Sequence, residues 1–320
     1  MAVSGEHVKA LVQSHAAGDD AGFYAVALQV AARAARQGHA RLANDLKQAI
    51  DASRREPVAR KVALIAQPRG ELADLVSASF PEVGIRDLVG PDALLDQVNQ
   101  VIGEQRQRQA LMDRGFPPVH RLLLEGPPGT GKTMTASVLA HELSLPLLTV
   151  RLESLLSKFL GETASKLRTV FDAMAEQRAV HLFDEFDALG GDRAGNDVGE
   201  ARRILNSFLV FLEQAGPESI VVAATNHRSI LDRALFRRFD MMITYQLPDV
   251  TQAGLVMKAR LGPMGSDIRW SDLDTSNLSH AELVKAAETA AKQAIMRGDN
   301  QVTSSDLRRA LDACRVAGIV

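Results

Sequence analysis

The stretch from Gly126 to Thr133, which reads Gly-Pro-Pro-Gly-Thr-Gly-Lys-Thr, constrains the fold of this chain more than any other. An apolar run from Leu122 to Leu124 precedes it, and a helical pattern from Thr135 to Leu143 follows it. A buried strand, a glycine-rich turn and a helix start together form a phosphate cradle. The glycines let backbone N–H groups converge on phosphate oxygens, and the positive end of the helix favours the anion. Since the spacing and both flanks agree, a chance glycine-proline loop before a helix is disfavoured.

Two side chains of this stretch indicate the ligand. Lys132 is placed to reach the β- and γ-phosphates of a nucleotide, and the Thr133 hydroxyl is placed to coordinate Mg²⁺. We therefore expect ATP and Mg²⁺ as ligands. The residues expected to contact the nucleotide here are Gly126, Pro127, Pro128, Gly129, Thr130, Gly131, Lys132, Thr133 and Met134.

Short apolar segments alternate with helical patterns after residue 112. Such alternation predicts an α/β fold, with a parallel sheet covered by helices on both faces. Ligands of these sheets bind beyond the carboxyl ends of the strands. The predicted strands are Arg121 to Glu125, Pro146 to Val150, Val180 to Asp184, Ile220 to Thr225 and Met241 to Gln246.

Polar residues end two of the predicted strands. Asp184 and Glu185 follow an apolar run, so Asp184 is placed to hold Mg²⁺ through its water shell and Glu185 to polarise an attacking water. The alternative is that these are solvated acids that end a strand, and the presence of the phosphate cradle makes this alternative less favoured. Asn226 ends the next strand and would orient the lytic water or contact the γ-phosphate. His181 is interpreted as a core or interface residue.

Composition limits the class of protein. Lys+Arg 37 against Asp+Glu 39 gives a net charge of -2, so overall charge favours neither nucleic acid nor an anionic membrane. The only cysteine, Cys314, cannot form an intramolecular disulfide, which fits a reducing compartment. No apolar run approaches the roughly 18 residues that span a bilayer, and the first twenty residues lack a signal-peptide pattern. We expect a cytoplasmic protein with no membrane span.

The chain divides by pattern into four regions. Residues 1–56 show apolar residues at three- and four-residue spacing and predict an N-terminal helical bundle. Residues 57–84 are punctuated by prolines and are interpreted as a linker, with short strand or helical pieces. Residues 85–247 form the predicted α/β nucleotide-binding domain, and residues 248–320 a small all-helical domain. Basic residues of the bundle lack interleaved aromatics, so a nucleic-acid role is disfavoured.

From about Asp87 to Val316 the sequence resembles the AAA family of ATPases, in the branch that contains katanin, spastin and the AAA protease motors. Gly126 to Thr133 corresponds to Walker A, Leu182 to Glu185 to Walker B, and Asn226 to the first sensor. The resemblance implies a homo-oligomeric ring, usually a hexamer, with ATP bound between subunits.

A second resemblance concerns the stretch from Ser157 to Glu162, which is similar to the first pore loop of the family. It implies that Lys158, Phe159, Leu160 and Gly161 project into a central channel and grip an extended polypeptide. An aromatic side chain packs against any sequence, and the glycine lets the loop move. Ordinary core residues on a helix are the alternative. Gly190 to Gly195 lies where the family carries a second pore loop.

The stretch from Leu231 to Asp240 resembles the arginine-finger segment of the family. The resemblance implies an arginine that reaches a neighbouring subunit and neutralises charge at its γ-phosphate. Two adjacent arginines replace the longer Arg-Pro-Gly-Arg form, so Arg238 is the first choice and Arg237 the second. A surface pair bonded to Asp240 or Asp232 is the alternative.

The stretch from Ser279 to Leu283 resembles the segment that covers the adenine, usually Ser-Gly-Ala-Asp-Leu. Ser279 and Ala281 would then contact the nucleotide, with His280 in place of the glycine. No arginine occupies this segment, unlike in many relatives that act on DNA. Val89 and Gly90 match the positions that line the adenine pocket from the other side.

Together these patterns predict an ATP-driven motor that remodels protein clients. The N-terminal bundle would recruit a client or an adaptor. A separate protease could receive the threaded chain, because no His-Glu-x-x-His motif is present. Two alternatives keep the ATP site: a ring that acts on nucleic acid, and a nucleotide-switched scaffold that rarely hydrolyses ATP. Near-neutral charge disfavours the first, and the presence of both Asp184 and Glu185 disfavours the second.

Overall fold

The computed structural model describes residues 26, 27, 30, 31, 68, 70–155, 160–189, 198–227 and 236–318. The chain divides into two compact units, Met1–Leu64 and Ile65–Val320. In the first unit the described residues Val26, Ala27, Val30 and Ala31 are helical. The predicted N-terminal bundle otherwise lies outside the described residues. The second unit carries the fold described below.

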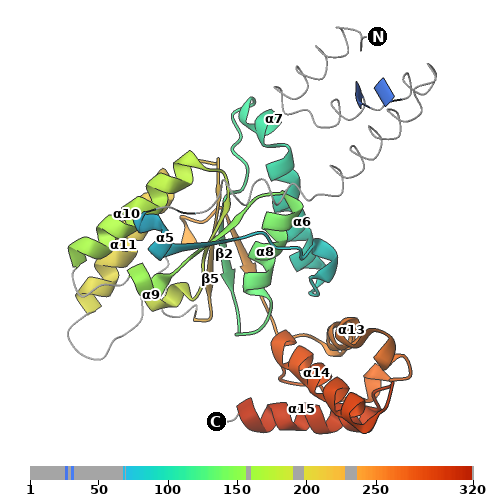
Figure 1. Ribbon diagram of the computed structural model, residues 1–320. Helices are drawn as coiled ribbons and strands as arrows, with labels where there is room; N and C mark the ends of the chain where they lie inside the picture. The colour runs from blue at the N-terminus through green and yellow to red at the C-terminus, as the bar shows by residue number, and fades with distance from the viewer. Residues whose placement is uncertain are drawn as a thin grey trace. The chain divides into compact units, whose positions relative to one another are not determined.

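A six-stranded sheet forms the centre of the second unit, with strand order β1-β3-β4-β5-β2-β6 (Figure 1). Five strands are parallel to one another, and β1 is antiparallel to β3. The predicted parallel sheet is confirmed. The strands are β1 Val76–Ser79, β2 Arg121–Glu125, β3 Leu147–Val150, β4 Val180–Phe183, β5 Ile220–Thr225 and β6 Met241–Thr244.

The edge strand β1 lies within the range 57–84 that the sequence analysis interpreted as a linker, directly after helix α5 (Glu71–Leu75). Val76 pairs with Val150 and Ser79 with Leu147. The sequence Val-Ser-Ala-Ser alternates apolar and polar residues, but it is only four residues long and mostly small, so its pairing depends on the edge of β3 that it meets.

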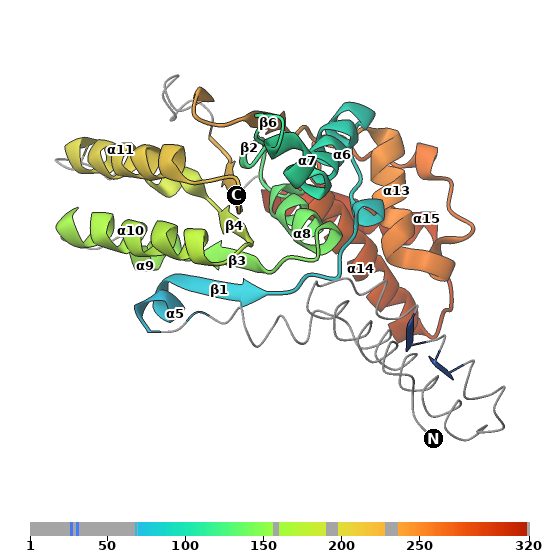
Figure 2. The same cartoon turned by 90° about the horizontal axis from the view of Figure 1, so that it is seen from above.

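Helices cover both faces of the sheet (Figures 1 and 2). Because successive strand side chains point to opposite faces, β4 sends Leu182 into the core under α6 (Asp92–Arg106) and α8 (Lys132–Glu142), and Phe183 into the core under α10 (Leu160–Glu176) and α11 (Val198–Gln214). Shorter elements connect these layers: η1 Ile85–Asp87, α7 Arg108–Met112, α9 Leu152–Leu155 and η2 Phe186–Leu189.

Phenylalanine rings pack around the end of β4. Phe183 and Phe186 are fully buried, and both contact Phe208 of α11, with ring centroids 5.0 and 4.6 Å away. These rings flank Asp184 and Glu185 in sequence. The aromatic cluster therefore fixes the backbone on both sides of the two carboxylates.

Three C-terminal helices follow the sheet: α13 Val250–Leu261, α14 His280–Arg297 and α15 Ser304–Gly318, with the turns η4 Gly262–Gly265 and η5 Trp270–Asp272. They enclose an alanine-rich core that includes Ala286, Ala287 and Ala290. Asp249 caps α13 and Ser279 caps α14, each in a capping box. The predicted all-helical region is confirmed.

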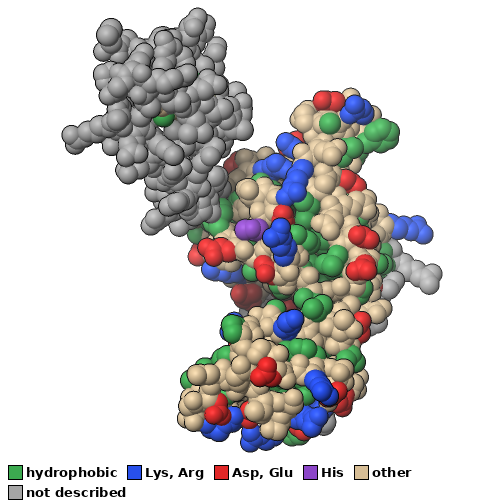
Figure 3. Space-filling model, turned by 90° about the vertical axis from the view of Figure 1, so that its right-hand side faces the viewer, with side chains coloured by type: hydrophobic (Ala, Val, Ile, Leu, Met, Phe, Trp, Pro, Cys, Tyr) green, Lys and Arg blue, Asp and Glu red, His purple; other side chains and the backbone are tan. Residues whose placement is uncertain are grey.

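The surface carries charges of both signs, and on the face shown in Figure 3 they are interspersed over the described residues. Within the described ranges, no helix combines the length and the apolar character that crossing a membrane requires.

Candidate functional site

The phosphate loop, defined here as Gly126 to Gly131, joins the end of β2 to the start of α8. Its glycines are required by the backbone: φ is 147° at Gly126, 73° at Gly129 and 104° at Gly131. A Cβ at Gly126 would lie 2.5 Å from the Tyr245 carbonyl oxygen, and one at Gly129 would lie 2.7 Å from Ser279 Oγ. The loop is thus held against β6 on one side and against α14 on the other.

Lys132 begins α8 and is almost fully buried. Its Nζ donates to the carbonyl oxygens of Gly126, at 2.8 Å, and Pro127, at 2.7 Å. Burial lowers the pKa of the Lys132 ammonium, and the carboxylates of Asp184 and Asp187 oppose that fall. The ammonium is therefore held inside the loop, where phosphate oxygens could replace the carbonyls as its acceptors.

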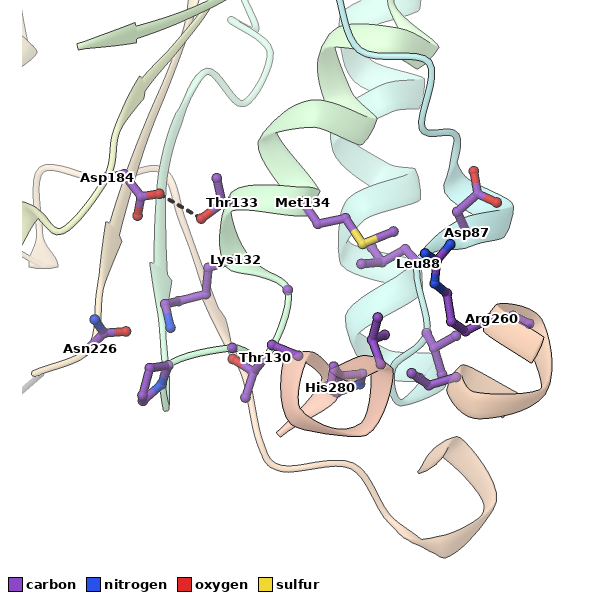
Figure 4. Close-up of a pocket in the computed structure, with 18 of the residues that line it drawn as sticks. Asp87, Leu88, Thr130, Lys132, Thr133, Met134, Asp184, Asn226, Arg260 and His280 are labelled. Atoms are coloured by element: carbon purple, nitrogen blue, oxygen red, sulfur yellow. Dashed lines mark hydrogen bonds between the residues drawn. The ribbon is translucent and has the colours of Figure 1, made fainter. Parts of the chain in front are cut away.

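Thr133 and Asp184 meet across the gap between α8 and β4 (Figure 4). Thr133 Oγ1 donates to Asp184 Oδ2 at 2.7 Å. A hydroxyl and a carboxylate oxygen are the hard ligands that Mg²⁺ takes in nucleotide sites, so the residues present fit this ion. The two residues expected to hold the metal are thus already adjacent.

Glu185 follows Asp184 in a left-handed conformation, with φ 51°. This region is unfavourable for a residue with a Cβ and marks local strain. The Glu185 N–H donates to Asp184 Oδ1 at 2.9 Å, and its side chain is exposed. The turn presents the Glu185 carboxylate to the cavity beside Asp184.

Asp187 was not singled out by the sequence analysis. Its Oδ1 accepts hydrogen bonds from Thr225 Oγ1, at 3.0 Å, and from the Asn226 N–H, at 3.3 Å. A third acidic residue in the same turn as Asp184 and Glu185 was the sequence signal that could have found it.

A cavity of about 860 Å³ opens beside the phosphate loop (Figure 4). Its polar end is defined here by Lys132, Thr133, Asp184, Glu185 and Asn226. Its apolar end is defined by Leu88, Val89, Val256, Ala259 and Val284, from the segment before α6 and from helices α13 and α14. A polar end beside a phosphate loop and an apolar end under helices match the two halves of a nucleotide.

The cavity contains most of the predicted nucleotide contacts. The predicted residues that line it are Val89, Pro128, Gly129, Thr130, Gly131, Lys132, Thr133, Met134, Asp184, Glu185, Asn226 and Ala281. Gly90, Gly126, Pro127 and Ser279 do not line it. The lining residues that were missed are Arg86, Asp87, Leu88, Val256, Ala259, Arg260 and Val284, because their positions depend on packing between segments far apart in sequence.

The start of α14 contacts the phosphate loop directly. The Ala281 N–H donates to the Gly129 carbonyl oxygen at 3.0 Å. His280, which stands where the resemblance expected a glycine, lines the cavity, and neither of its shielded ring nitrogens has a hydrogen-bond partner among the described residues. Burial lowers the pKa of His280, and an interaction with the Val89 backbone that falls short of hydrogen-bond geometry opposes this fall.

The two candidate finger arginines lie away from this cavity. Arg238 NH1 is 2.6 Å from Glu213 Oε1 of α11, and Arg237 is exposed. Asp240, one of the two acids of the alternative, pairs instead with Arg121, at 2.6 Å, and with His120, and the other, Asp232, lies outside the described residues. Burial raises the pKa of Asp240, but the hydrogen bonds from His120 and Arg121 outweigh it and hold that pKa well below its usual range.

The candidate pore-loop residues Lys158 and Phe159 lie outside the described residues, as does the stretch 190–195. Leu160 and Gly161 begin helix α10. His181 is buried in β4, and burial lowers its pKa to about 3. The imidazole is therefore neutral, as befits a core residue.

The phosphate loop at the carboxyl edge of a parallel sheet, with carboxylates after β4 and an asparagine after β5, defines a P-loop nucleotide-binding site. The profile of the "ATPase family associated with various cellular activities (AAA)" matches residues 122–247. A Sinorhizobium fredii protein named "Uncharacterized AAA family ATPase y4kL" is 33% identical over 323 residues, which cover 98% of this chain and 97% of that protein. The chain belongs to the AAA family of ATPases.

Other relatives are AAA proteases. A protein of Sphaerobacter thermophilus named "ATP-dependent zinc metalloprotease FtsH 3" is 31% identical over 257 residues, which cover 76% of this chain and 52% of that protein. A Helicobacter felis protein named "ATP-dependent zinc metalloprotease FtsH" is 31% identical over 259 residues, which cover 76% of this chain and 40% of that protein. The chain thus spans about half or less of the length of these relatives.

Proposed function

We propose that this chain hydrolyses ATP in a Mg²⁺-dependent reaction and couples hydrolysis to the remodelling of protein clients. The observation that carries the proposal is the cavity with the phosphate loop and two carboxylates at one end and apolar helices at the other. In this site bound Mg²⁺ would neutralise charge on the β- and γ-phosphates, held by Thr133 and, through water, by Asp184.

Each remaining residue of the polar end has a role that follows from its place. Lys132 would exchange its two carbonyl acceptors for phosphate oxygens. Glu185, exposed beside Asp184, would take a proton from the attacking water. Asn226 would orient that water or bond the γ-phosphate. Val89 and Ala281 would enclose the adenine, with Gly90 and Ser279 supporting them from behind.

The active form we propose is a ring of identical chains, most simply a hexamer. Arg238 would reach the γ-phosphate bound to the neighbouring copy, with Arg237 as the second candidate. Arg238 would have to release Glu213 in order to bind that phosphate. Their position away from the chain's own cavity supports a role in trans.

For the client we propose an extended polypeptide, gripped by Lys158, Phe159, Leu160 and Gly161 in the channel of the ring. The N-terminal region 1–56 would recruit the client or an adaptor. Of the predicted linker 57–84, the part before α5 would join it to the nucleotide-binding region 85–247 and the helical region 248–320, because β1 belongs to the sheet. The names of the FtsH relatives support a motor that serves proteolysis. A separate protease is thus a possible partner, and we place the reaction in the cytoplasm.

The test is the ATPase rate of the full chain with an unfolded protein, with DNA, or with neither. Stimulation by the unfolded protein supports the proposal, and stimulation by DNA alone contradicts the proposed client. Phe159→Ala should keep basal turnover within a few-fold and abolish client unfolding. Lys158→Ala removes a charge from the same loop and leaves the aromatic ring, so it should lower client unfolding less than Phe159→Ala does.

A further inference from the structure

Asp187 connects the ends of two neighbouring strands. It lies in η2, three residues after Asp184, and its Oδ1 accepts from both Thr225 Oγ1 and the Asn226 N–H, at 3.0 and 3.3 Å. The register of β4 and β5 ends with Phe183 opposite Ala223. Beyond that pair β4 turns away while β5 continues to Thr225, so no ladder hydrogen bond fixes the distance between the two ends.

Thr225 extends this connection to the phosphate loop. Its carbonyl oxygen accepts from the Gly126 N–H at 3.3 Å, and its Oγ1 also accepts from the His227 N–H at 3.1 Å. The Asp187 carboxylate therefore connects the turn after β4 to Thr225, and Thr225 in turn contacts the phosphate loop and precedes Asn226. The hydroxyl that donates to Asp187 is nearly fully buried.

Asp187 does not line the cavity, whereas Glu185 and Asn226 do. It is thus not placed to touch a nucleotide or a metal ion, although its charge acts on Lys132 and opposes the fall of the pKa of that ammonium. What it can do is hold the Asn226 backbone at a fixed distance from the Glu185 turn, which is itself strained and needs external restraint.

We propose that Asp187 is a positioning residue: by binding Thr225 and the Asn226 N–H it sets the spacing between Glu185 and Asn226 that ATP hydrolysis requires. The inference rests on the proposed ATPase function and deepens it. Its contribution is made in the transition state, because ground-state binding of the nucleotide depends on the phosphate loop and the apolar end.

The experiment compares Asp187→Ala, Asp187→Asn and Thr225→Val for kcat, ATP affinity and melting temperature in the full chain. Asp187→Ala should lower kcat about 10- to 100-fold, the loss expected for a hydrogen bond to a charged group, and change ATP affinity less than about threefold. Thr225→Val should lower kcat in the same direction, and the double variant should be no slower than Asp187→Ala alone. Asp187→Asn keeps an acceptor oxygen and should recover part of the rate.

Three results overturn the inference. One is an Asp187→Ala protein with kcat within twofold of wild type. Another is an equal loss of kcat and affinity that follows a lowered melting temperature, which marks a structural role. The third is a wild-type kcat in Thr225→Val. This result overturns the inference even if Asp187→Ala does not fold. Wild-type protein without any ATP turnover would instead refute the proposed function, and this inference with it.

Discussion

The polar and apolar ends of the cavity are built from different kinds of contact. At the polar end directional bonds hold several groups: Lys132 donates to two carbonyls and Thr133 to Asp184, and behind the cavity wall Asp187 bonds the end of β5. At the apolar end the walls are Leu88, Val256 and Val284, with Asp87 and Arg260 beside them, and no hydrogen bond of normal geometry holds the His280 nitrogens among the described residues. Directional bonds fix atoms closely, whereas apolar contacts fix only shape and volume.

This difference indicates that the two ends have different roles in binding and hydrolysis. The polar end, held by the sheet and by buried phenylalanines, is organised before any ligand arrives, which is what stabilising a transition state requires. The apolar end belongs largely to the C-terminal helices and can adapt to the position of the ligand. Substitutions at the polar end should therefore cause large losses of either nucleotide affinity or kcat, depending on the residue. Substitutions at the apolar end should cause small losses of affinity.

The largest effects should come from two substitutions at the polar end, one that lowers ATP affinity and one that lowers kcat. Lys132→Ala removes a charged donor to the phosphates and should weaken ATP binding about 100-fold or more. Glu185→Gln keeps the shape and removes the base, so kcat should fall about 10²- to 10⁴-fold with affinity retained. Titration calorimetry and a phosphate-release assay measure the two quantities.

The same pair of variants reports on assembly. Glu185→Gln with ATP should accumulate the ring, as measured by light scattering, whereas Lys132→Ala should not. A monomeric Glu185→Gln protein in the presence of ATP would contradict the proposal that the site is shared between two copies.

Gly129 links the two ends, and its substitution tests whether they act together. Gly129→Ala places a Cβ 2.7 Å from Ser279 Oγ and should displace the start of α14, weakening nucleotide binding by about tenfold or more. Gly131→Ala is the matched control. Its φ of 104° is also positive and strained for alanine, but its Cβ would meet only Leu88, at 3.7 Å. Equal losses in the two variants would show that strain alone, and no contact between the ends, is responsible.

The polar end was largely predictable from sequence, because its residues belong to short local patterns. The order Gly126 to Thr133 and the pair Asp184 and Glu185 follow directly from strand ends and turn chemistry. Asp187 was missed because its role depends on its neighbour β5, which no local pattern encodes. The partner of Arg238 was missed for the same reason, since Glu213 lies on a separate helix.

The apolar end could be predicted only in part. Val89 and Ala281 were found through resemblance, but Val256, Ala259 and Val284 come from helices whose packing brings them to the loop from more than a hundred residues away. Aliphatic residues on an amphipathic helix show which face is buried, and they do not show whether a protein core or a ligand covers it. The edge strand β1 was expected only as a short strand or helical piece inside a linker for a related reason, since its partner β3 is what defines it.

A smaller effect should follow from loss of the cap on α14. Ser279 Oγ accepts from the Glu282 N–H, and the Glu282 carboxylate accepts from the Ser279 N–H at 2.7 Å. Ser279→Ala should cost about 1 kcal/mol of stability and weaken nucleotide binding a few-fold, because Ala281 bonds the phosphate loop from the same turn. Thr303→Ala removes the corresponding bonds before α15, which does not line the cavity. It should cost similar stability in a denaturant titration with no change in affinity, and a matching loss of affinity would refute the coupling.

The mildest change should be His280→Leu, which keeps volume and removes two unbonded nitrogens. At pH 7 we expect a melting temperature equal to or above that of wild type, and nucleotide affinity within about fivefold. Because burial lowers the pKa of His280, the unfolded chain binds more protons, and this residue makes the wild type lose stability as the pH falls below about 6.5. The stability advantage of His280→Leu should therefore grow between pH 7.5 and 5.5, while the contribution of His181, present in both proteins, cancels. A loss of affinity of about 100-fold would instead show that His280 bonds the nucleotide directly, and the apolar end would then be as directional as the polar one.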